Sequence, residues 1–319
     1  MIRLGVIGTG RIAARFMNDQ ELVPEIYVTC IYNPHMKSAK LFAERFQVKK
    51  FTDDWSDLVS CVDAVYIASP HQTHMEYVKS ALKSRKHVLC EKPMAFSKKS
   101  IEELYNFAEQ NGVVLMEAIK TAYCPGFKHL MQTASSGVIG TICDVEACFT
   151  KLEDPLGREL SDSSYGGSVI ELGTYVLLPI IKIFGDNATD IQFLSIKNAK
   201  GIDIFTKINL IYEQRFGLGK VGLGVKSEGN LIISGTSGYI YAKSPWWLTR
   251  EYEIRYEDPN KRELYTFEFE RNGLLYEVQA FVDEIRSHKR KHNENKVIST
   301  AIAGIMEKYF EQKDRAEHL

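Results

Sequence analysis

The sequence lacks the features of several special protein classes. Its net charge is −1 and its pI about 6.7, so no overall field attracts it to nucleic acid or to a membrane surface. No apolar run approaches the ~20 residues needed to span a bilayer, and no internal repeat or low-complexity linker is present. With 319 residues, 45% apolar and 25% charged, the chain has the size and composition of a soluble globular protein with two domains.

The six cysteines contain no C-x-x-C pair, and the histidines and cysteines lack the spacing of a closed zinc site. Four of the cysteines lie in apolar, strand-like runs, where a buried, reduced thiol is expected. Because the pattern predicts a strand from the N-terminus onward, we expect no signal peptide. We therefore expect a cytoplasmic protein that holds no metal.

The chain begins with a predicted strand, a glycine-rich turn and a helix. Gly8 lets the backbone reverse, Gly10 leaves room for a pyrophosphate, and a small residue at Ala13 allows close packing of helix on strand. The start of the helix offers N–H groups and a positive dipole end to phosphates. This pattern predicts a dinucleotide site, with cofactor contacts from Gly8, Thr9, Gly10, Arg11 and Ile12.

Up to residue 120, short apolar strands alternate with helices. After the first strand, the pattern predicts further strands at 26–32, 50–51, 63–68, 87–90 and 113–117. Continuous apolar strands joined by helices are typical of a doubly wound parallel sheet that is covered on both faces. We therefore predict an α/β Rossmann domain over 1–120, with ligands at the carboxyl ends of its strands.

Beyond residue 120 the pattern changes to alternating strands, interrupted by one long helix over 168–184. It predicts an α+β domain over 121–319 with a large, mostly antiparallel sheet. Two closing helices are expected at about 273–290 and 297–312. The basic run 286–292 falls at a helix end, where positive charge complements the dipole, so it does not indicate nucleic-acid binding.

Several segments carry a family resemblance, in the same order and over most of the chain. They are 68–74, 81–82, 86–93, 116–118, 166–168, 173–175 and 235–238. Glu91-Lys92-Pro93, at the end of the fifth strand, is the most distinctive of them. Together they resemble the Gfo/Idh/MocA family of oxidoreductases, named for glucose–fructose oxidoreductase and inositol dehydrogenase. The resemblance implies a Rossmann domain that binds NAD or NADP, followed by a substrate-binding α+β domain.

The resemblance places Lys92 beside the nicotinamide and the reacting carbon. There an ammonium polarises a hydroxyl or carbonyl oxygen, whereas the alternative is a solvated loop lysine. Pro93 is expected to follow a cis bond. Glu91 is assigned to the same cofactor site with its role left open.

The turn after the fourth strand is expected to contact the cofactor. Ser69, Pro70 and His71 would do so largely through their backbone, and His74 is a further cofactor candidate. For His74, a capping or core role is the alternative. Asn33, at the end of the second strand, occupies the position facing the ribose 2′-hydroxyl. Because no arginine stands there, the sequence leans slightly towards NAD over NADP.

In the second domain, Glu171 and Tyr175 are four residues apart and share one helix face. By resemblance they take the positions of the family's acid/base pair, although an aspartate is common where Glu171 stands. We predict that Tyr175 is the general acid/base, Lys92 holds the reacting oxygen, and Glu171 orients one of them. A buried aromatic residue is the alternative for Tyr175. Lys120 is a candidate substrate contact that would favour an anion, or else a solvated lysine.

These residues predict an NAD(P)-dependent oxidoreductase that acts on a secondary hydroxyl or carbonyl of a sugar, cyclitol or related polyol. A trans-dihydrodiol dehydrogenase or a carbonyl or imine reductase is the alternative within enzymes. A non-catalytic nucleotide-binding regulator is the alternative outside them. The open face of the second sheet is expected to form a homodimer or homotetramer through residues 141–150 and 217–243.

Overall fold

The computed structural model describes residues 1–287 and 292–317. The chain divides into two compact units, Met1–Lys120 with Glu270–Thr300, and Thr121–Phe269 with Ala301–Leu319. The first break thus falls where the sequence pattern changes, while the segment after Phe269 returns to the first unit. Most of the basic run 286–292 lies outside the described residues.

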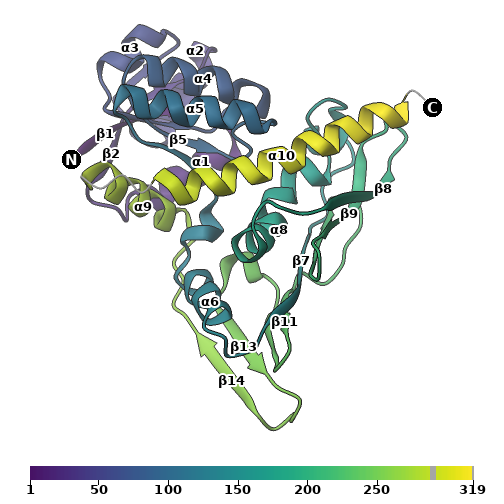
Figure 1. Cartoon of the computed structure of the whole chain (residues 1–319). Helices are drawn as coiled ribbons and strands as arrows, with labels where there is room; N and C mark the ends of the chain where they lie inside the picture. Colours follow the sequence, from purple (N-terminus) through teal and green to yellow (C-terminus); the bar gives the residue numbers. More distant parts are fainter. Residues whose placement is uncertain (288–291, 318–319) are drawn as a thin grey trace. The chain divides into compact units, whose positions relative to one another are not determined.

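The first unit is built on a six-stranded parallel sheet in the order β3-β2-β1-β4-β5-β6. In Figure 1, α4 and α5 lie in front of this sheet. The predicted doubly wound sheet is therefore confirmed. Strand β4 is buried at every residue, as expected when helices cover both faces. The order reverses between β1 and β4, which is where such sheets bind ligands. The strands are β1 (Ile2–Ile7), β2 (Ile26–Tyr32), β3 (Lys50–Thr52), β4 (Ala64–Ile67), β5 (His87–Glu91) and β6 (Leu115–Ala118).

Two helices of this unit begin at side chains that satisfy their first N–H groups. Asp54 accepts from two amides at the start of α3, and Ser97 accepts from Ser100 N at the start of α5. Helix α4 lies beside α5, and α1 contacts α9. The helices are α1 (Arg11–Gln20), α2 (Met36–Arg45), α3 (Trp55–Ser60), α4 (His71–Lys83), α5 (Lys98–Asn111) and α9 (Leu274–Arg286).

Asp19, at the end of α1, holds the start of α9 by hydrogen bonds, although the two segments are far apart in the sequence. Its buried carboxylate accepts from Leu274 N at 3.0 Å and from Asn272 N at 3.2 Å. A carboxylate at the start of a helix satisfies amides that have no partner within the helix. The first of the two predicted closing helices thus belongs to the Rossmann unit and ends at Arg286.

The second unit contains an eight-stranded sheet in the order β14-β13-β12-β11-β7-β10-β9-β8. Its neighbours are antiparallel except for β7 and β10, so the predicted mostly antiparallel sheet is confirmed. A parallel pair needs a long crossover, which here runs through two helices, α7 and α8, and two strands. The strands are β7 (Ile142–Thr150), β8 (Asp190–Lys197), β9 (Asp203–Ile211), β10 (Phe216–Gly222), β11 (Leu231–Gly235), β12 (Tyr239–Ala242), β13 (Glu251–Arg255) and β14 (Arg262–Thr266).

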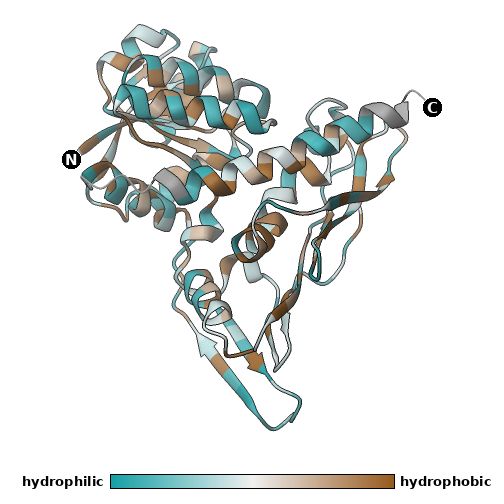
Figure 2. Ribbon diagram, in the orientation of Figure 1, coloured by the Kyte–Doolittle hydropathy of each residue, from teal (hydrophilic) through white to brown (hydrophobic). Residues whose placement is uncertain are grey.

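Helix α8 covers one face of this sheet and contacts β7, β9 and β10. Figure 2 shows hydrophobic residues along its length, as expected for a helix buried on most sides. The remaining elements are the helices α6 (Pro125–Ser135), α7 (Arg158–Ser161), α8 (Ser168–Phe184) and α10 (His292–Glu317), and the 3₁₀ turns η1 (Lys120–Tyr123) and η2 (Trp246–Leu248).

All six cysteines are free, and Cys30, Cys90, Cys124 and Cys148 are buried. Cys30, Cys90 and Cys148 lie in strands, as expected for buried thiols, whereas Cys124 lies at the start of α6 and Cys143 of β7 is half-buried. Burial raises the pKa of the Cys90 thiol well above its ordinary value, which keeps it protonated. Among the described helices, none combines the length and apolar character that crossing a bilayer requires.

Trp246 provides a test of the second unit's core. Its side chain is fully buried, and its Nε1 donates to the carbonyl of Cys148 at 2.8 Å. We predict that Trp246→Phe lowers the free energy of unfolding by about 1–3 kcal/mol, because the buried carbonyl loses its donor. Urea denaturation checks this, with the half-buried Trp55→Phe as a control. Equal midpoints for the Trp246 variant and the parent would contradict it.

Candidate functional site

The glycine turn after β1 has the geometry of a phosphate cradle. Gly8 has φ +102°, and a Cβ there would lie 2.5 Å from the carbonyl oxygen of Ala68. Gly8 is thus required by the close approach of the end of β4. A Cβ at Gly10 would meet nothing within 4 Å, so packing does not account for this glycine. The turn leads directly into α1, whose N-cap is Gly10, and it fits a dinucleotide pyrophosphate.

Two of the residues predicted to bind the cofactor, Asn33 and Thr9, are hydrogen-bonded to each other. The Asn33 side chain donates from Nδ2 to Thr9 Oγ1 at 2.9 Å, and its Oδ1 accepts from His35 N at 2.9 Å. The carboxamide therefore links the loop after β2 to the glycine turn. This arrangement fixes a neutral side chain, without a carboxylate or guanidinium, just after the end of β2.

His74 holds together the turns that follow β4 and β5. Its Nε2 lies 2.8 Å from the carbonyl oxygen of Ser69, and its Nδ1 lies 2.9 Å from that of Pro93. Burial lowers the pKa of His74 to about 4, so the ring is neutral and donates to one carbonyl at a time. The core role that the sequence left open therefore accounts for its contacts. The Lys92–Pro93 peptide bond is cis, as expected.

Buried carboxyl groups lie around Lys92. Glu91 accepts from the Tyr66 hydroxyl at 2.6 Å, and Glu117 accepts from Met94 N at 2.8 Å. Burial raises the pKa of both carboxyl groups, and the nearby Lys92 ammonium opposes that rise. Glu91 therefore faces the interior of the first unit and supports the lysine electrostatically.

Lys120 and Glu277 extend this buried cluster. Lys120 Nζ donates to the carbonyl of Asn272 at 2.9 Å. Glu277 is fully buried, and burial followed by repulsion from Glu91 raises its pKa well above the ordinary value. The Lys120 ammonium opposes the rise for both acids. These contacts give Lys120 a role within the first unit, beside the substrate role assigned from the sequence.

In the second unit, Glu171 and Tyr175 interrupt an otherwise buried helix. From Ser168 to Ile181, these are the two residues of α8 that are not buried. Glu171 Oε1 accepts from Arg158 Nη2 at 2.6 Å, across the loop from α7 to α8. The predicted shared face is therefore present, and its carboxylate is held in one orientation by a guanidinium.

An aromatic wall continues from Tyr175. Its ring lies edge-on to Phe149, with centroids 5.1 Å apart, and Phe149 stacks on Trp247 at 3.6 Å. Trp247 is half-buried, whereas Trp246 lies in the core. An apolar wall beside a hydroxyl and a carboxylate suits a ring-shaped substrate with polar edges. The sequence signals missed Phe149 and Arg158, because each meets its partner across a distant element.

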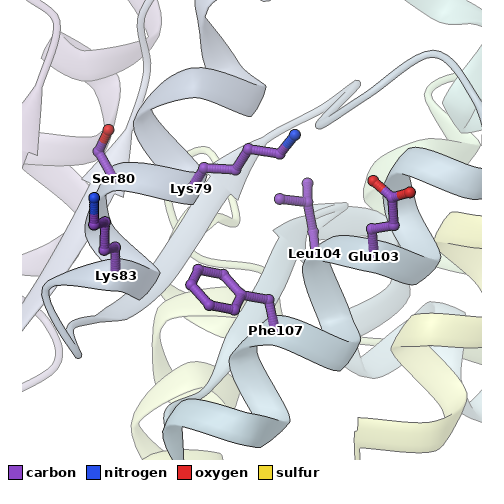
Figure 3. A pocket seen from close by; sticks show the side chains of 6 residues that line it. All are labelled: Lys79, Ser80, Lys83, Glu103, Leu104 and Phe107. Carbon is purple, nitrogen blue, oxygen red and sulfur yellow. The ribbon is translucent and has the colours of Figure 1, made fainter.

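A surface groove between α4 and α5 lies apart from these groups. Figure 3 shows its lining by Lys79, Ser80, Lys83, Glu103, Leu104 and Phe107. The groove lies along two helices and away from the carboxyl ends of the strands, so it forms no part of the cofactor cradle. Within 1–287 and 292–317, no group of three His, Cys, Asp or Glu residues is arranged to hold a metal ion.

Comparisons with known proteins agree with this geometry. The model of an oxidoreductase family with an NAD-binding Rossmann fold, GFO_IDH_MocA, matches residues 2–119. Scyllo-inositol 2-dehydrogenase (NADP⁺) IolU of Bacillus subtilis is 31% identical, over 98% of this chain and 97% of its own length. Trans-1,2-dihydrobenzene-1,2-diol dehydrogenase of Sus scrofa is 27% identical, over 80% of this chain and 78% of its own.

A solved structure extends the likeness to both units. KijD10, a 3-ketoreductase from Actinomadura kijaniata, was solved in complex with TDP-benzene and NADP in an open conformation. It superposes with a TM-score of 0.80 and 25% identity, covering 96% of this chain and 95% of its own. Similarity over nearly the whole chain, the matching Rossmann model and the shared fold lead to one conclusion. The chain belongs to the Gfo/Idh/MocA family of NAD(P)-dependent oxidoreductases.

Proposed function

We propose that this chain transfers a hydride between NAD(P) and a secondary hydroxyl or carbonyl of a sugar, cyclitol or related polyol. Tyr175 carries the proposal, because it is half-buried on a helix that is otherwise buried and shares a helix face with a carboxylate that is held by Arg158. The similarity to a scyllo-inositol dehydrogenase over 98% of the chain supports a cyclic polyol. A bound nicotinamide would supply the hydride acceptor or donor, and the protein would manage the proton.

The residues then divide the work at one substrate oxygen. In the oxidation direction, Tyr175 takes the hydroxyl proton as the carbon gives up its hydride, and in reduction it returns that proton. Lys92 stabilises the negative charge that develops on the oxygen. Glu171, paired with Arg158, orients the phenol. The cradle of Gly8, Thr9, Gly10, Arg11 and Ile12 would bind the cofactor, with Asn33, Ser69, Pro70 and His71 completing its contacts and His74 supporting that turn.

A trans-dihydrodiol substrate is the second candidate, and the aromatic wall favours it. Phe149 and Trp247 stack beside Tyr175, which would accept the flat face of an unsaturated ring. A non-catalytic regulator of the same fold is the remaining alternative. Absorbance of NAD(P)H at 340 nm, followed with cyclitols, sugars, dihydrodiols and their ketones, separates the three. Turnover of a polyol supports the proposal, and binding without turnover of any substrate supports the regulator.

Tyr175→Phe tests the acid/base role. We predict that turnover falls by about 10²–10⁴-fold, the usual contribution of general acid–base catalysis, because the proton carrier is lost. The ring remains, so cofactor affinity measured by fluorescence titration should be unchanged. Tyr165→Phe, elsewhere in the same unit, is the control. Turnover of the Tyr175 variant at the parent rate would refute the assignment.

Lys92→Ala tests the electrophilic role and is expected to behave differently. It removes the charge that holds the reacting oxygen, and it leaves Glu91 and Glu117 without the nearby ammonium. We predict a loss of turnover of at least about 10²-fold together with weaker cofactor binding. Lys86→Ala, a lysine at the other end of β5, is the control. A Lys92 variant that loses neither property would eliminate the lysine from the site.

The cofactor preference is proposed to lean towards NAD. Asn33 is neutral and already donates to Thr9, and the segment Asn33-Pro34-His35 brings no guanidinium to a 2′-phosphate. The names of the Bacillus relative and of the KijD10 complex, which specify NADP, support the opposite preference. We predict that NADH binds at least as tightly as NADPH in isothermal titration. A preference for NADPH above tenfold, about 1.4 kcal/mol, would reverse the lean.

The second sheet is proposed to join two or four subunits through 141–150 and 217–243. Helix α8 covers one face of the sheet. Leu194 and Ile196 on β8, and Phe216 next to the second of these ranges, are 54–59% exposed in the same sheet. Exposed apolar side chains in one sheet indicate a contact surface. We predict that sedimentation velocity at micromolar concentration shows a dimer or tetramer, and that Phe216→Glu shifts it towards the monomer. A parent chain that sediments only as a monomer would rule this out.

A further inference from the structure

Helix α8, which carries Glu171 and Tyr175, begins without a capping side chain of its own. Its N-cap residue is Gly167, and its first turn presents amides that have no acceptor within the helix. The amide of Val169 instead donates to Asp203 Oδ2 at 3.0 Å. Asp203 is the first residue of β9, 34 positions along the chain. The cap of this helix is thus supplied by a different element.

The glycine at the start of α8 is required by that carboxylate. Gly167 has φ +118°, and a Cβ there would lie 2.1 Å from Asp203 Oδ1. Ser168 makes a second contact with the same residue. Its Oγ donates to the backbone carbonyl of Asp203 at 3.1 Å and accepts from Leu223 N at 3.0 Å. Residues 166–168 therefore pack closely around Asp203, and these contacts fix the start of α8 against β9.

Two hydroxyl groups hold the carboxylate in place. Tyr309 of α10 donates to Asp203 Oδ1 at 2.7 Å, and Thr206 donates to Oδ2 at 2.9 Å. Together with the bond from the Val169 amide, the Asp203 carboxylate accepts three hydrogen bonds, and the residue is only 1% exposed. Helix α10 approaches α8 again one turn further along, where a Cβ at Gly173 would lie 2.8 Å from Met306 Cε. The position of α8 thus depends on one carboxylate and its donors.

Burial makes this carboxylate unfavourable to ionise. It raises the pKa of Asp203 to about 6, while the hydrogen bonds from Tyr309, Thr206 and Val169 oppose the rise. The charged and titratable groups that face it are Tyr309 and Lys313 on α10. Because the folded pKa is raised, the stability this group contributes is fully present below pH 3.8 and is lost as the pH rises through about 6. At neutral pH, a charged Asp203 therefore does not stabilise the fold, so stability does not explain why an acid caps α8.

We propose that Asp203 is a positioning residue, which, held by Tyr309 and Thr206, fixes the start of α8 and so places Tyr175 and Glu171 at the reacting oxygen. This inference rests on the function proposed for Tyr175. The geometric need is strict, since a displacement of about 1 Å at a reacting group costs up to about 10²-fold in rate. An asparagine in this place has a single acceptor oxygen for three donors, so it cannot reproduce the arrangement.

Asp203→Asn, Tyr309→Phe and the control Glu213→Gln, an exposed acid of the same unit, test the proposal. For Asp203→Asn we expect kcat to fall by about 10- to 100-fold, with KM and cofactor affinity unchanged, in a protein that urea denaturation shows to be folded under the assay conditions. Its urea midpoint should fall, because a buried donor loses its acceptor. Tyr309→Phe should give a smaller fall in kcat, and Glu213→Gln none. Equal kcat for Asp203→Asn and the parent, or a lowered urea midpoint with parent kcat in Tyr309→Phe, would overturn the positioning role.

The pH profile of kcat gives a second readout. In the parent, kcat should decline as the pH falls through about 6, because the protonated carboxyl group accepts from fewer donors. Tyr309→Phe removes a donor that favours the charged form, so this acidic decline should move to higher pH. It should be absent in Asp203→Asn. The same decline in Asp203→Asn as in the parent would contradict the assignment.

A readout without turnover distinguishes failure here from failure of the proposed function. Hydrogen exchange should show the Val169 amide protected in the parent, with protection about tenfold lower in Asp203→Asn. The ¹³C ring signal of Tyr175, identified by its loss in Tyr175→Phe, should shift in the same variant. If no substrate turns over but both changes occur, Asp203 still positions Tyr175 and the proposed reaction alone is wrong. If neither occurs, the positioning inference fails whether or not a substrate is found.

Discussion

At Gly8 the end of β1 comes so close to the end of β4 that a Cβ would lie 2.5 Å from the Ala68 carbonyl oxygen. This approach sets the turn into α1 and brings Thr9 to the Asn33 side chain. It also places the glycine turn beside Ser69, whose carbonyl oxygen lies 2.8 Å from the His74 ring, and His74 reaches on to Pro93. The cofactor cradle and the Lys92 turn are therefore parts of one connected framework at the carboxyl edge of the parallel sheet.

Both units contain buried acidic side chains near the residues that the proposed reaction uses. Burial raises the pKa of Glu91 and Glu117 near Lys92, that of Glu277 near Glu91 and Lys120, and that of Asp203 at the start of α8. Such groups oppose folding when charged, so their presence indicates a demand on geometry or electrostatics that apolar residues would not meet. In the first unit they support an ammonium, and in the second they fix the helix that bears a phenol and a carboxylate. These are the groups to which the proposed reaction assigns the oxygen and its proton.

The sequence predicted the fold class because its signals are local. Apolar strands up to residue 120, the glycine turn and the Glu91-Lys92-Pro93 segment each span a few residues, and the sheet order follows from general rules of connection. The rest depends on contacts between distant positions. The parallel pairing of β7 with β10, the approach of Arg158 to Glu171, the stack of Phe149 on Trp247 and the cap from Asp203 have no periodic signature. The sequence assigns His74 and Lys120 by position alone, and their hydrogen-bond partners emerge only from the folded chain.

The central claim is that Lys92 and Tyr175 act on one substrate oxygen. A crystal structure of the chain with NAD⁺ or NADP⁺ and a cyclic polyol that it oxidises tests this most directly. The account predicts that Lys92 Nζ and Tyr175 Oη both lie within about 2.6–3.2 Å of the same hydroxyl oxygen. It also predicts that the carbon bearing that oxygen faces the nicotinamide. A complex in which either side chain points away from the reacting hydroxyl, or in which the polyol binds away from both, would contradict it.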